Sequence, residues 1–123
     1  MGAQNVVPDG PPPAAQDLSN AYSALLRDLN DAYWVASSLE VKDQLYGIIE
    51  VVTSLITQLV ATDLASRDAA YAALVAQVAT VNTKLDALQK QINSMISRIN
   101  TAATIVSDIA KVLAVAARVI PGA

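Results

Sequence analysis

Apolar residues recur in alternating steps of three and four along the C-terminal part of the chain, from residue 71 to residue 120. We call these positions the C-terminal seam: Tyr71, Leu74, Val78, Val81, Leu85, Leu88, Ile92, Met95, Ile99, Ala102, Val106, Ile109, Leu113, Ala116 and Ile120. This spacing is typical of helices that pack lengthwise against other helices. No Gly or Pro interrupts the seam, so the pattern predicts one helix over 66–120, with an apolar stripe about 75 Å long at 1.5 Å per residue.

Two shorter helices are predicted upstream of the seam. The first covers 17–36, with Asp17 as its N-cap and an ordinary amphipathic pattern. The second covers 38–61, because Ser37 and Glu40 have the spacing of a capping box and the apolar repeat changes phase there. Residues 61–67 contain several cap-forming side chains but neither Gly nor Pro. We therefore favour a turn there and keep a continuous helix as the alternative.

These segments predict an all-α fold, an antiparallel helical hairpin or coiled-coil bundle of two to three helices with one long C-terminal helix. A single helical domain would occupy 17–120, preceded by a flexible Pro-rich arm over 1–16 and followed by a tail over 121–123. The first two helices, about 30 and 35 Å long, cannot cover a helix of about 75 Å in a compact bundle. This mismatch predicts self-association, at least as a dimer.

Composition limits the possible chemistry. The chain has no His and no Cys, which removes the commonest general base, the thiol nucleophile and the usual zinc ligands. We expect no enzymatic activity, no metal, no cofactor and no small-molecule substrate, and we interpret the carboxylate pairs Asp28/Asp31 and Glu40/Asp43 as solvated helix faces. The net charge of −3 argues against nucleic-acid binding. Only 15% of residues are charged, against about a quarter in typical soluble domains, so we expect an apolar or covered surface.

Membrane contact is a second possibility, suggested by the wide apolar face of residues 102–120. The favoured interpretation surrounds this stretch with three or more helices, and the alternative places it on a lipid surface. Three charges within 102–120 argue against a membrane span, and 45–61 is short and contains Glu50. The N-terminus lacks the basic and apolar regions of a classical secretory signal, which leaves the cytoplasm as the default expectation.

The sequence therefore predicts a non-catalytic self-assembly or protein-interaction module, whose partner is a second copy or another helical protein. The contact would use the C-terminal seam, above all these positions: Leu85, Leu88, Ile92, Met95, Ile99, Val106, Ile109, Leu113 and Ile120. The alternative is a membrane-active or lipid-surface protein that exposes apolar helices on contact. Trp34, beside Tyr33 and close to the first helix break, is expected to pack over the next helix, or else to anchor a partner.

Overall fold

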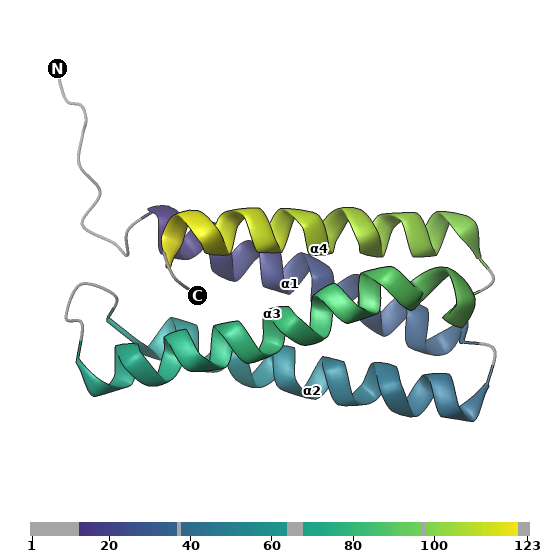
Figure 1. The fold of residues 1–123 in the computed structure, drawn as a ribbon, viewed down its shortest axis with the longest axis horizontal. Coiled ribbons are helices and arrows are strands. Elements are labelled where there is room, and N and C mark those ends of the chain that lie inside the picture. The colour runs from purple at the N-terminus through teal and green to yellow at the C-terminus, as the bar shows by residue number, and fades with distance from the viewer. Residues whose placement is uncertain (1–12, 37, 64–67, 97, 121–123) are drawn as a thin grey trace, which may run out of the picture.

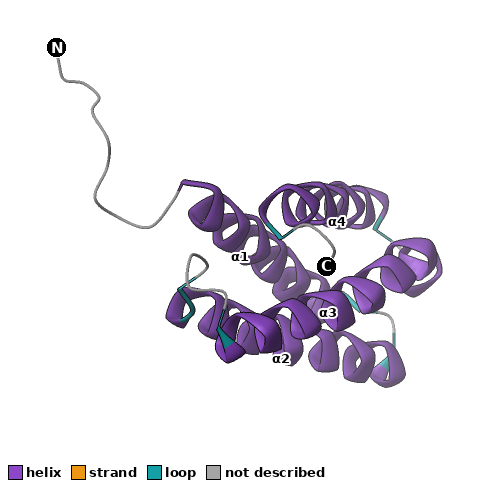
Figure 2. Ribbon diagram, turned by 60° about the vertical axis from the view of Figure 1, so that its left-hand side comes forward, coloured by secondary structure: helices purple, strands orange, loops and turns teal. Residues whose placement is uncertain are grey.

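The computed structural model describes residues 13–36, 38–63, 68–96 and 98–120, and they form a bundle of four helices (Figure 1). The helices are α1 (Pro13–Trp34), α2 (Leu39–Ala61), α3 (Ala69–Met95) and α4 (Ile99–Val119). Each packs against its neighbours in the order α1–α2–α3–α4, and α4 returns to α1. The α1–α2 and α3–α4 connections lie at one end of the bundle and the α2–α3 connection at the other (Figures 1 and 2). The prediction of an all-α bundle is confirmed.

The prediction of a single C-terminal helix over 66–120 is wrong. The chain leaves the helical conformation after Met95, and Ile96 is extended, with φ −128° and ψ 125°. Arg98 is also extended and precedes α4. The bundle therefore contains four helices where two or three were predicted. The argument that a bare helix of about 75 Å requires a second copy no longer applies, because the second half of the seam folds back along α1.

The helix breaks because a continuous helix over 66–120 would be much longer than the two preceding helices, which could not cover it. With the break, the four helices have 22, 23, 27 and 21 residues, and each finds neighbours of similar length. Folding back buries α4 side chains, including Ile105, Ile109 and Val112, at the cost of a few helical hydrogen bonds. Each such side chain contributes about 1.5–3 kcal/mol on burial, so packing outweighs local helix continuity. Asn93, Ser94 and Asn100 have low helix propensity, which makes this the weak point of the run.

The other helix boundaries differ from the prediction by a few residues. α1 begins at Pro13, inside the predicted arm, so Asp17 lies within the helix and is not its N-cap. α1 also ends at Trp34, two residues early. At α2 the N-cap is Ser38, whose Oγ accepts a hydrogen bond from the Val41 backbone N–H at 3.2 Å. The predicted cap Ser37, arm residues 1–12 and tail residues 121–123 lie outside the described residues.

The favoured turn between the second and third predicted segments is confirmed. α2 ends at Ala61, and the Thr62 hydroxyl donates to the Gln58 carbonyl oxygen at 2.6 Å. α3 begins after Asp68, whose carboxylate accepts a hydrogen bond from the Tyr71 backbone N–H at 3.1 Å. Polar side chains thus satisfy backbone groups at both helix ends, which is why this turn forms without Gly or Pro. Residues 64–67 lie outside the described part of the chain.

Candidate interaction surfaces

Most of the C-terminal seam is buried in the chain's own core. On α3 the buried seam residues are Leu74, Val78, Val81, Leu85, Leu88, Ile92 and Met95. On α4 the core positions are instead Ala102, Ile105, Ile109, Val112, Val115 and Ala116, with Ile120 just beyond the helix. The predicted positions Val106 and Leu113 are only half-buried, and Ile99 is 79% exposed. The phase of the core stripe shifts at the α3–α4 connection, because α4 faces α1 rather than continuing along α3.

The core face of α4 explains part of its broad apolar pattern. Among the described helices α1 and α3 pack against α4 (Figures 1 and 2), where three or more neighbours were predicted, and Ala103, Ala110 and Ala117 remain exposed. Small side chains at Ala102 and Ala116 are fully or almost fully buried. Short side chains at buried positions allow close approach of two helices. Ile109 and Ile120, two of the predicted contact positions, are thus buried within the monomer.

A cluster of aromatic side chains forms the corner between α1 and α2. The Tyr33 and Trp34 rings meet edge to face with centroids 5.3 Å apart, and Tyr46 lies 6.4 Å from Tyr33. The Lys42 ammonium sits 5.2 Å from the Tyr33 ring centroid and 5.7 Å from that of Trp34. A cation at these distances is attracted to the negative ring faces. We call these four residues the aromatic corner.

The aromatic corner leaves much of its surface in solvent. Trp34 is 74% exposed and Tyr46 is 54% exposed, so Trp34 does not cover the next helix as favoured from the sequence. Leu39, at the start of α2, is 75% exposed. Ile99 begins α4 at the same end of the bundle (Figure 1). Large apolar side chains therefore gather at the end that carries the α1–α2 and α3–α4 connections.

An outward apolar stripe runs from this corner along α2. We call it the α2 stripe, and its positions follow alternating steps of three and four: Leu39, Lys42, Tyr46, Ile49, Thr53, Ile56 and Val60. Lys42 and Thr53 are its two polar positions. Ile49 and Ile56 are half-buried against the core, and Val60 is 74% exposed. The buried α2 residues are Leu45, Val52, Leu55 and Leu59, on an adjacent face. The sequence alone does not separate this stripe from the core repeat of the same helix, because apolar residues occupy positions on both faces.

α2 is apolar along most of its length, although few of its residues are fully buried. It has 23 residues and a mean hydropathy of 1.4 over its most apolar stretch, of which 22% is buried. Among the described helices it is the one long and apolar enough to cross a membrane by length and composition. The sequence-based exclusion of 45–61 rested on its short length and on Glu50. The observed helix is longer because it begins at Leu39, and it still contains Glu50.

Two hollows lined by described residues lie on the bundle surface. One lies between α2 and α3, has a volume of about 260 Å³, and is lined by Gln44, Ile48, Lys84, Ala87, Leu88, Gln91 and Met95. The other lies between α1 and α4, measures about 210 Å³, and is lined by Asp28, Asp31, Asn100, Thr101 and Thr104. The first is a shallow gap between aliphatic side chains with a polar rim. The second is polar and acidic.

Asp108, on α4, lies near the acidic hollow. Its Oδ2 atom is buried without a hydrogen-bond partner. The pKa of the Asp108 carboxyl is raised from 3.8 to about 6, mainly by burial and then by the neighbouring Asp28 carboxyl, against smaller opposing effects of Arg27 and Lys111. Within the described residues no three acidic side chains converge as metal ligands.

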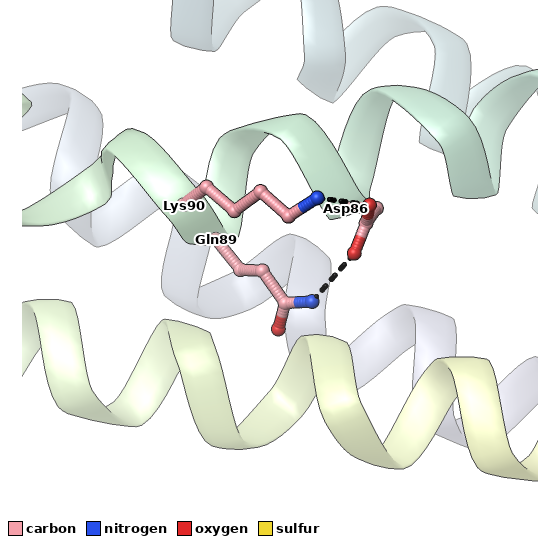
Figure 3. A network of polar contacts seen from close by, with 3 residues as sticks. All are labelled: Asp86, Gln89 and Lys90. Atoms are coloured by element: carbon pink, nitrogen blue, oxygen red, sulfur yellow. Dashed lines mark hydrogen bonds and ion pairs between the residues drawn. The ribbon is translucent and has the colours of Figure 1, made fainter.

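By contrast, the carboxylate of Asp86 on α3 is well satisfied. The Gln89 side-chain amide donates to Asp86 Oδ1 at 2.8 Å, and Lys90 Nζ lies 3.1 Å from Oδ2 (Figure 3). The Gln89 hydrogen bond and the Lys90 charge lower the pKa of the Asp86 carboxyl. These residues lie one turn apart on one helix, and such solvated pairs contribute little to stability.

Comparison with family models, curated proteins and solved structures finds no match to this chain. The surfaces described above are thus the basis for a functional proposal.

Proposed function

We propose that this protein is a non-catalytic helical interaction module that pairs with a second copy of itself along the α2 stripe. The observation that carries the proposal is the exposure of apolar side chains on α2, where Leu39, Tyr46 and Val60 are each more than half exposed and 22% of the residues in the most apolar stretch are fully buried. Exposed apolar surface of this extent marks interaction sites in soluble proteins. We place the contact on α2 and not on the C-terminal seam, because most of the seam is buried in the chain's own core.

The spacing of the α2 stripe favours a helix as the partner. Alternating steps of three and four are the pattern that one helix presents to another in a coiled coil. In an antiparallel pairing, Leu39 of one copy lies opposite Val60 of the other, and both side chains are about three-quarters exposed in the monomer. α2 is about 35 Å long. Stable complexes usually bury about 800 Å² per partner, so the pairing would have to run along the whole of α2 and include the aromatic corner at each end.

The mass of the full-length protein in solution tests this proposal. We expect light scattering coupled to gel filtration to give twice the chain mass of 12.8 kDa. Val60→Asp should shift the mass to that of a monomer, since it places a charge in the contact. Ala61→Asp is the matched control, because Ala61 is the next residue after Val60, is also exposed, and lies off the α2 stripe. A wild-type monomer across micromolar concentrations, or a Val60→Asp variant that remains dimeric, would overturn the proposal.

A lipid surface is the second candidate for the same helix. α2 is long and apolar enough for membrane contact, and Trp34, Tyr46 and Lys42 at its N-terminal end are residue types enriched at membrane–water interfaces. Trp34 is the sole tryptophan of the chain and is exposed, so it reports its own surroundings. A blue shift of Trp34 emission on adding phosphatidylcholine vesicles would favour the lipid candidate. A shift that depends only on protein concentration would favour the dimer.

A further inference from the structure

The aromatic corner holds one cation against two aromatic rings. The Tyr33 and Trp34 rings stand at 90° to each other with their centroids 5.3 Å apart, so they present two walls at a right angle. The Tyr46 ring stands beside them, 6.4 Å from the Tyr33 ring and tilted by 53°. Lys42 Nζ lies over both walls, 5.2 Å from the Tyr33 centroid and 5.7 Å from the Trp34 centroid. A single positive charge therefore faces two rings at once.

The Lys42 ammonium is held by these rings and not by an acid. Its side chain is half-buried, and among the described residues no carboxylate forms an ion pair with it. The end of α1 adds to the attraction, because the C-terminus of a helix carries partial negative charge. α1 ends at Trp34 and has no basic residue of its own in its last turn. The ring faces and the helix end thus favour a cation at the same point.

We propose that the aromatic corner is a binding site for a quaternary ammonium group such as that of choline, and that Lys42 occupies this site in the free protein. Proteins recognise quaternary ammonium ligands with the faces of aromatic rings. A Lys ammonium is a strongly hydrated point charge on a flexible stem, so it leaves the rings readily. A trimethylammonium group carries methyl groups in place of those N–H donors and gives up less hydration on contact with a ring.

The rings of the site are accessible to a ligand from solvent. Trp34 is 74% exposed and Tyr46 is 54% exposed. Lys42 and Tyr46 also belong to the α2 stripe, so a second copy packed on that stripe would compete with the ligand. The Val60→Asp variant removes this competition without altering the aromatic corner, because Val60 lies at the other end of α2. Binding is therefore measured in the wild-type protein and in Val60→Asp.

Titration of the full-length protein with choline chloride tests the proposal. Trp34 is the sole tryptophan of the chain, so its emission reports binding at the site itself. We expect a saturable change with a dissociation constant on the order of millimolar, because few contacts form at an exposed site. Sodium chloride controls for ionic strength. The uncharged isostere of choline, with a tert-butyl group in place of trimethylammonium, should give no saturable change over the same range.

Two substitutions distinguish a cation site from general contact with the surface. Lys42→Ala should tighten choline binding about threefold to tenfold, because the ligand no longer competes with a tethered cation. Lys84→Ala is the matched control, since it removes the same charge from an exposed position on α3. Tyr33→Leu removes the ring that contacts both other aromatic residues and should weaken binding by a similar factor. Circular dichroism checks that each variant keeps its helices.

Vesicles separate the two sources of the same ligand chemistry. A stronger response to phosphatidylcholine vesicles than to phosphatidylglycerol vesicles assigns the site to a lipid headgroup, and a response to free choline alone assigns it to the soluble cation. Two results contradict the site: no saturable response to choline in Lys42→Ala, or equal responses to choline and its uncharged isostere. Since both are also measured in Val60→Asp, the ligand site and the dimer fail separately.

Discussion

Tyr22 on α1 donates a hydrogen bond of 2.6 Å from its phenolic hydroxyl to Asn82 Oδ1 on α3. These two helices stand at opposite corners of the bundle, since each packs against α2 and α4. Tyr22 is fully buried and Asn82 is half-buried, so the bond crosses the core. A polar link of this kind fixes the register of two helices that share few other contacts, because apolar packing alone tolerates small slips.

Removing the Tyr22 hydroxyl should therefore destabilise the fold. Tyr22→Phe leaves the Asn82 side chain without this partner, and we expect a loss of about 1–2 kcal/mol in the free energy of unfolding, measured by urea denaturation. Tyr46→Phe removes an exposed hydroxyl and serves as the control. Equal stability of Tyr22→Phe and the wild type would mean that the diagonal bond is absent in solution.

Alkaline pH should act on the same hydroxyl. Burial raises the pKa of Tyr22 above its ordinary value of 10.0, while the bond to Asn82 lowers it by less. In the unfolded chain the phenol ionises near pH 10, so stability is lost as the pH rises above that value. In an ultraviolet titration of the phenols, we expect ionisation of Tyr22 to coincide with loss of helical circular dichroism. Ionisation of all four tyrosines while the helices remain intact would contradict this.

Two isoleucines of the C-terminal seam distinguish a broken helix from a continuous one. Ile92 is fully buried in α3, whereas Ile99 is 79% exposed at the start of α4. Ile92→Asp buries an unpaired charge and should abolish the folded bundle at 25 °C. Ile99→Asp should change the melting temperature by no more than a few degrees. If one seam were buried along an unbroken helix, both variants would unfold by circular dichroism.

A capping substitution at the start of α4 is expected to stabilise the protein. Arg98 occupies the N-cap and makes no side-chain hydrogen bond to the helix. Arg98→Ser should stabilise the protein by about 0.5–2 kcal/mol, because Ser caps orphan N–H groups and the cation leaves the positive end of the helix. Ser38→Ala, which removes the observed α2 cap, should cost a similar amount. In a continuous helix Arg98→Ser would instead be neutral or destabilising, as Ser is the weaker helix former.

Gly47 is an exposed residue in the middle of α2, and a Cβ atom placed there meets nothing within 4 Å. Gly47→Ala should therefore raise the free energy of unfolding by about 0.5–1 kcal/mol, through the reduced backbone entropy of the unfolded chain. Thermal unfolding followed by circular dichroism measures the change. A destabilised Gly47→Ala variant would indicate that α2 is covered closely at this point, for example by a partner helix.

Periodicity and composition by themselves determined that this protein is helical and which residues of α3 face the core, and they favoured a turn between α2 and α3. Those features depend on neighbours three or four positions apart, and the printed sequence contains them directly. Leu85 and Ile92, for example, lie in the core as their spacing predicted.

Only the tertiary structure decided that the C-terminal seam breaks after Met95, that Ile99 faces solvent, and that Tyr22 meets Asn82. Each of these depends on which helix lies beside which, over separations of tens of residues. Ser and Asn at 93–100 permit either a helix or a turn, and the choice falls to the burial gained when α4 packs on α1. Local propensity differences of under 1 kcal/mol per residue cannot outweigh that burial.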